Sequence, residues 1–166
     1  MESFDLLRQI GAGSSFREAL CNMIGASQMF GDFDWHDIEM LSSYMQAYDA
    51  EKGMVLFREG EAGDFLCLII EGKVDIFKED VQRKEKNVAT VGPGKTLGEM
   101  AIIDGEPRSA SAIVAEQSIL TLLTKANFER IVREKPALAT KILLKISRLL
   151  SQRLRRTSGL LVDHLE

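Results

Sequence analysis

Between residues 54 and 123, short apolar segments alternate with glycine-rich or charged turns, a pattern that fits few folds. Strands are expected at residues 54–57, 65–70, 73–77, 88–91, 111–115 and 119–123. Glu71-Gly72 is expected to form a tight hairpin turn, because glycine adopts the positive φ that such turns require. Strands at this spacing predict an antiparallel sandwich or roll rather than parallel βαβ units.

Helical patterns precede the strands. Residues 1–29 are expected to form a helix, a glycine-rich loop and a second helix, most simply a pad that covers the roll, although a partner-docking role stays open. Asp34 is expected to cap a helix over residues 35–48, because its side chain can accept a hydrogen bond from the first turn. Trp35, at the start of that helix, is interpreted as a core anchor.

Helical patterns also follow the strands. A helix is expected over residues 126–133, and Pro136 takes the favoured first position of a second, longer helix. Gly159 is expected to loosen or end that long helix. Its apolar stripe is wider than one packed face needs, which indicates that part of it meets a second chain. The residues concerned are Leu143, Ile146, Leu150 and Leu154.

Residues 98–112, GEMAIIDGEPRSASA, combine groups that suit a phosphate and a sugar. Gly98 lets backbone approach a ligand closely, and residues 99–103 are expected to form one helical turn with free N–H groups. Arg108 offers a planar fork of donors, with the Ser109 hydroxyl beside it. Glu99 would repel a phosphate, so it suits a sugar hydroxyl. The alternative is a surface ion pair of Glu99 with Arg108.

The segment Gly98-Glu99-Met100-Ala101, followed by Pro107-Arg108-Ser109-Ala110, resembles the phosphate-binding cassette of cyclic-nucleotide-binding domains. This family includes bacterial catabolite activator proteins and regulatory subunits of cyclic-AMP-dependent kinase. The resemblance implies a mainly β fold with flanking helices: an antiparallel, jelly-roll-like β-roll at about residues 50–124 and C-terminal helices at about 125–163. The domain would span residues 30–166, after an N-terminal helical extension over residues 1–29.

The resemblance also implies the roles of individual residues. Arg108 and Ser109 would hold the cyclic phosphate with help from the backbone of Met100, Ala101 and Ala110, while Glu99 would bind the ribose 2′-hydroxyl. Near the C-terminus, Thr157 and Ser158 resemble the Thr-Ser pair that contacts adenine in catabolite activators, although they stand one helical turn further from Pro136. The alternative for this pair is polar residues near a helix end. Cyclic AMP is the expected ligand, with cyclic GMP as the second choice.

Composition and residue types exclude several other functions. A net charge of −4 argues against a nucleic-acid binder driven by overall charge. Cys21 and Cys67 are too few for a disulfide framework or a zinc site, and no signal peptide or membrane span is recognisable, so a cytoplasmic protein is expected. His36 and His164 lie outside the strands, which disfavours a cupin-type metalloenzyme; no catalytic residue, metal or cofactor is expected.

The sequence therefore predicts a regulatory sensor that is not an enzyme. It would signal through an unknown effector protein or through rearrangement of a homodimer built on the C-terminal helix. No helix-turn-helix pair is recognisable after that helix, so direct DNA binding is not expected. Two alternatives stay open: a scaffold of the same fold that binds no nucleotide, and a transcription regulator that acts with a separate DNA-binding protein.

Overall fold

The computed structural model describes residues 7–11 and 14–162 of the chain. These residues belong to two compact units, Met1–Glu129 and Arg130–Glu166, which are considered separately below. The first unit holds all the strands, together with α1 (Ser14–Gly25), α2 (Trp35–Ser42), α3 (Glu99–Asp104) and the first half of α4 (Lys125–Glu134). The second unit holds the rest of α4 and α5 (Pro136–Val162).

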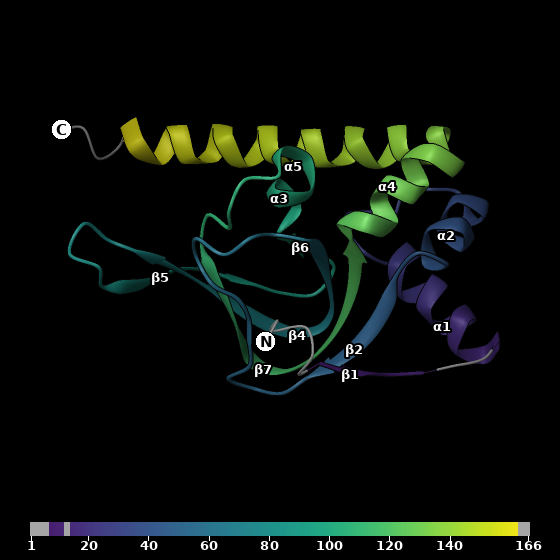
Figure 1. The fold of residues 1–166 in the computed structure, drawn as a ribbon, viewed down its shortest axis with the longest axis horizontal. Helices are drawn as coiled ribbons and strands as arrows, with labels where there is room; N and C mark the ends of the chain where they lie inside the picture. Colours follow the sequence, from purple (N-terminus) through teal and green to yellow (C-terminus); the bar gives the residue numbers. More distant parts are fainter. Residues whose placement is uncertain (1–6, 12–13, 163–166) are drawn as a thin grey trace. The chain divides into compact units, whose positions relative to one another are not determined.

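Within the described residues, the strands form one seven-stranded sheet in which every pairing is antiparallel (Figure 1). The main path runs β1-β2-β7-β4-β5, while β3 pairs with β7 and β6 pairs with β4. The predicted mainly β fold with an antiparallel roll and flanking helices is thus confirmed. The strands are β1 (Arg8–Gln9), β2 (Gln46–Ala50), β3 (Val55–Phe57), β4 (Phe65–Glu79), β5 (Glu85–Val91), β6 (Thr96–Leu97) and β7 (Ser111–Thr124).

The two longest strands correct the predicted hairpin. Residues 65–79 form one continuous strand with register shifts around Glu71, so no turn separates residues 65–70 from 73–77. Gly72 has the predicted positive φ of 85°, but the cause differs: a Cβ there would overlap Ser118 Oγ and lie 2.5 Å from Gln117 O. Glycine at this position therefore allows a close approach between two neighbouring strands, β4 and β7. Residues 111–124 are likewise a single strand.

Apolar side chains fill the interior of the roll. Along β4, alternate residues face one side of the sheet, and the whole segment 65–69 is buried because both of its faces are covered. The described members of the roll's core are Tyr48, Ala50, Leu56, Phe57, Phe65, Cys67, Ile69, Val74, Leu97, Ala112, Val114, Leu120 and Leu122. Both cysteines are free and buried.

The N-terminal helices are only partly as predicted. Asp34 does cap α2, accepting a hydrogen bond from Asp37 N at 2.8 Å. The helix ends at Ser42, however, and residues 46–50 form β2, because pairing with β7 satisfies their backbone groups in a sheet. Trp35 is 49% exposed, so its assignment to the core is wrong. In the predicted first helix, residues 8–9 form β1 and residues 1–6 lie outside the described residues.

In the second unit, α5 begins at Pro136 as predicted and continues through Gly159 to Val162, so the predicted break at Gly159 is wrong. No atom of the described residues outside this helix lies within 4 Å of the place where a Gly159 side chain would be. Across the described part of the chain, no helix combines the length and the apolar character that a membrane crossing requires.

Candidate functional site

The predicted cassette is built around α3, a six-residue helix with a glycine at each end. Gly98 precedes it with φ 78° and Gly105 follows it with φ 71°, both in the left-handed region that favours glycine. A Cβ at Gly98 would lie 2.5 Å from Arg108 Nη1 and 3.0 Å from Phe65 O. Gly98 is therefore needed both for the turn into α3 and for the close approach of Arg108.

Arg108 is the central side chain of the site, and it is only 4% exposed. Its guanidinium lies against two aromatic rings, 4.1 Å from the centroid of Phe57 and 4.5 Å from that of Phe65. Nη1 donates to Gly98 O at 3.1 Å. The two rings and this hydrogen bond fix the orientation of the cation inside the apolar roll.

The remaining donors of this cation are not satisfied within the described protein. Nε and Nη2 of Arg108 are buried and have no hydrogen-bond partner there. Burial lowers the pKa of Arg108, although the negative charges of Asp64, Glu61 and Glu99 oppose this effect. Leaving charged donors unpaired in a dry site is costly, so the geometry calls for an anion beside Arg108.

Access to Arg108 depends on a second glycine. At Gly63 a Cβ would overlap Ala101 Cβ and would lie 3.1 Å from Arg108 Nε. Gly63 therefore keeps open the space around one of the unpaired donors. The sequence predicted a turn at residues 59–64, and the position of Gly63 beside Arg108 became visible in three dimensions.

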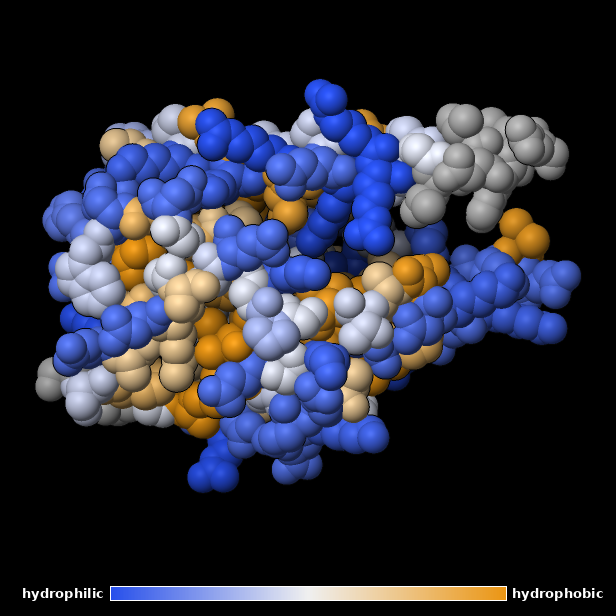
Figure 2. All heavy atoms as spheres, turned by 180° about the vertical axis from the view of Figure 1, so that it is seen from behind, coloured by the Kyte–Doolittle hydropathy of each residue, from blue (hydrophilic) through white to orange (hydrophobic). Residues whose placement is uncertain are grey.

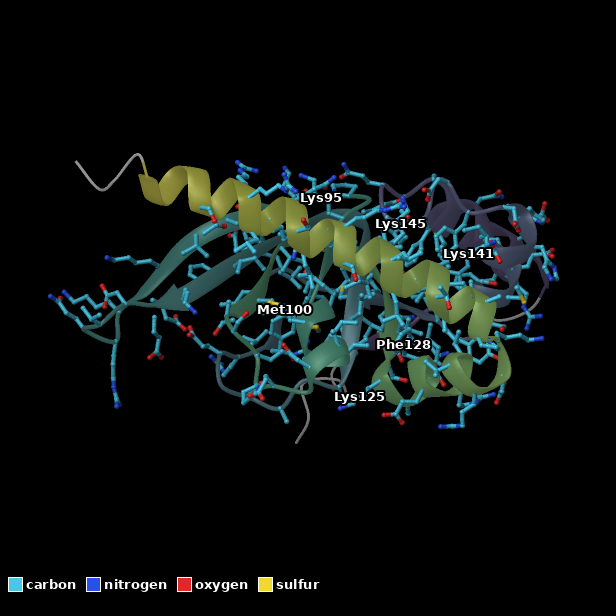
Figure 3. The ribbon with its side chains drawn as sticks, turned by 90° about the horizontal axis from the view of Figure 1, so that it is seen from above. Lys95, Met100, Lys125, Phe128, Lys141 and Lys145 are labelled. Atoms are coloured by element: carbon cyan, nitrogen blue, oxygen red, sulfur yellow. The ribbon has the colours of Figure 1, made fainter. Side chains whose placement is uncertain are left out.

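The other predicted cassette residues lie around this centre. Glu99 is 1% exposed and Arg108 is 4% exposed, so the alternative of a surface ion pair between them is wrong. Ala101 is also buried, at 3% exposed. Ser109 is exposed, and its Oγ lies 3.9 Å from the sulfur of Met100, which projects from α3 and is 45% exposed (Figure 3). Ala110 is half-buried and directly precedes β7. These contacts bring residues from both halves of the cassette together.

Thr157 and Ser158 lie on α5, in the second unit, and both are exposed. Their contact with a base stays a prediction.

The sequence did not predict Phe57 and Phe65 as partners of Arg108. An aromatic residue in a strand is interpreted as part of the core, and no local signal indicates the cation that it contacts.

Other chemistries find no support among the described side chains. No cluster of three or more His, Cys, Asp or Glu that could hold a metal is present in that part of the chain. His36 is exposed, as predicted, and His164 lies outside the described residues. Burial raises the pKa of the Cys67 thiol, so this cysteine is a poor nucleophile.

The chain is similar to known proteins. The family model described as "Cyclic nucleotide-binding domain" matches residues 49–135. A cyclic AMP receptor protein of Thermus thermophilus is 31% identical over 129 residues, covering 78% of this chain and 58% of that protein. A CRP-like cAMP-activated global transcriptional regulator of Mycobacterium tuberculosis is 32% identical over 126 residues, covering 76% and 54%. The chain thus spans little more than half the length of these relatives.

Solved structures show the same similarity in three dimensions. A cyclic nucleotide-binding domain from Methylobacillus flagellatus superposes with a TM-score of 0.85 at 30% identity, covering 100% of this chain and 93% of that one. The catabolite activator protein of Thermus thermophilus gives a TM-score of 0.73 at 30% identity, covering 84% and 63%.

Proposed function

The chain belongs to the cyclic nucleotide-binding domain family, and on that premise we propose that it is a regulatory module that binds cyclic AMP. The observation that carries the proposal is the buried Arg108 guanidinium with two unpaired nitrogens. A cyclic phosphate supplies one negative charge and several acceptor oxygens, which suit those donors. Cyclic AMP is preferred to cyclic GMP because the relatives above are named as cyclic AMP receptors or cAMP-activated regulators.

Each cassette residue has a part in this proposal. Arg108 and Ser109 hold the phosphate, together with the backbone of Met100, Ala101 and Ala110. Glu99 accepts a hydrogen bond from the ribose 2′-hydroxyl, and Gly98 keeps the backbone close. Thr157 and Ser158 contact the base. None of these side chains is assigned a catalytic step, so the output is a change in an effector protein or in the assembly of the chain. We place the module in the cytoplasm.

The proposal is tested on the unmodified chain by calorimetric titration and thermal unfolding with cyclic AMP, cyclic GMP and a cyclic dinucleotide. At a cyclic AMP concentration of about 100 times Kd, the free energy of unfolding is expected to rise by about 2.7 kcal/mol. Cyclic GMP should bind more weakly, and the dinucleotide should not bind. Absence of binding by all three would contradict the proposal and favour the scaffold alternative.

We also propose a homodimer formed through α5. Leu143 and Leu154 are 38% and 68% exposed, and they share one side of this helix with the half-buried Leu150. A two-fold pairing would bury this stripe on both copies.

Leu154→Glu is expected to convert the dimer to monomers, because it puts a charge into the apolar contact. Light scattering of the purified chain measures this. Leu144→Glu is the matched control, since Leu144 is 53% exposed but lies about 80° from Leu154 around the helix axis. A wild-type chain that is monomeric at tens of micromolar contradicts the proposed dimer.

A further inference from the structure

Two loops distant in sequence hold each other beside the candidate site. Gly60 N donates to Arg108 O at 2.8 Å, and Arg108 N donates to Glu61 O, also at 2.8 Å. Glu59 N donates to Ser111 Oγ at 2.9 Å. Two backbone hydrogen bonds therefore join the loop that carries Arg108 to the loop that follows β3, and the Ser111 side chain adds a third.

The same region is tied to the hairpin formed by β4 and β5. Near the end of β4, Lys78 Nζ donates to Ser109 O at 2.7 Å and lies 3.2 Å from Glu59 Oε1. The other oxygen of Glu59, Oε2, accepts from Glu79 N at 3.0 Å. The Glu79 N–H and then Lys78 lower the pKa of Glu59, so this carboxylate is ionised at neutral pH.

The bond to Ser109 O bears directly on a group of the proposed site. In a planar trans peptide, the carbonyl of Ser109 and the N–H of Ala110 point in opposite directions. When Lys78 holds the carbonyl, it also fixes the direction of the Ala110 N–H. That N–H is one of the backbone donors proposed to bind the phosphate, although Lys78 itself lies on the other side of the peptide.

We propose that Lys78 and Glu59 are positioning residues for the nucleotide, which orient the peptide between Ser109 and Ala110 without touching the ligand. This inference rests on the proposed function. It gives the β4–β5 hairpin a role, because Lys78 lies among the last paired residues of β4 before the turn, where the hairpin extends beyond the other strands (Figure 1). The hairpin presents a mainly hydrophilic surface (Figure 2).

Lys73 provides a matched control on the same strand. Its Nζ pairs with Glu116 at 3.4 Å, and the Lys73 and Lys78 side chains are 53% and 54% exposed. Lys78→Met is expected to weaken cyclic AMP binding by about threefold to tenfold, the range of one partly exposed charge-assisted bond, whereas Lys73→Met should change it by less than about twofold. Calorimetric titration of the full chain measures both, and thermal unfolding without ligand should give similar midpoints.

Two further variants separate positioning from a general effect of charge. Lys78→Arg keeps a donor near Ser109 O and should recover most of the affinity that Lys78→Met loses. Glu59→Gln and Lys78→Met should lose less together than the sum of their separate losses, because both belong to one clamp. Additive losses, or equal affinity of Lys78→Met and Lys73→Met, overturn the inference while the proposed function stands. If the wild-type chain binds no cyclic nucleotide, the proposed function fails and this inference fails with it.

Discussion

Replacing Arg108 by methionine is expected to weaken cyclic AMP binding by about a hundredfold or more, because at least two charge-assisted hydrogen bonds of about 1.5–3 kcal/mol each are lost. The free energy of unfolding of the ligand-free chain should rise or stay unchanged. The methionine removes a buried cation whose Nε and Nη2 have no partner, and it keeps an apolar stem between Phe57 and Phe65.

Titration calorimetry and ligand-free chemical denaturation together test this prediction. Arg58→Met is the control, since Arg58 is an exposed arginine next to β3 and should change neither quantity appreciably. A variant that lacks Arg108 and still binds cyclic AMP within about threefold of wild type would show that the anion is held elsewhere. Loss of folding in the methionine variant would show that the guanidinium is structural.

The second large effect is expected at Gly98, with Gly105 as its counterpart at the other end of α3. Both residues have positive φ, so Gly98→Ala and Gly105→Ala should each lower the free energy of unfolding by about 1–2 kcal/mol. Only Gly98→Ala should also damage the site, because its Cβ would meet Arg108 Nη1 at 2.5 Å and the Phe65 backbone at 3.0 Å. At Gly105 the nearest atom is Lys125 Nζ at 3.3 Å, the end of a flexible side chain.

We therefore expect cyclic AMP affinity to fall by about tenfold or more in Gly98→Ala and to stay within about twofold in Gly105→Ala. Denaturation curves and titrations of the two variants give the comparison directly. Equal affinities in the two alanine variants would mean that Arg108 adjusts to the extra methyl group, and that the site tolerates movement of its central cation.

Local sequence signals determined several features without help from the rest of the chain. The Asp34 cap, the start of α5 at Pro136 and the short helix after Gly98 each depend on residues within a few positions of one another. The start of a helix can be predicted in this way, because the hydrogen bonds and the backbone angles that make it are local. The cassette could be recognised for the same reason, because its residues are contiguous in the sequence.

Tertiary structure decided the features that depend on distant partners. Residues 46–48 were predicted to be the end of a helix, but pairing with β7, about 70 residues away, makes residues 46–50 a strand. Gly72 was read as a turn, and its contact with Ser118 shows a close approach of two strands instead. Arg108 became the centre of the site because Phe57 and Phe65 enclose it and leave two of its nitrogens, Nε and Nη2, without a hydrogen-bond partner. Strand pairing and burial bring together residues that are far apart in the sequence, so no local sequence pattern predicts these contacts.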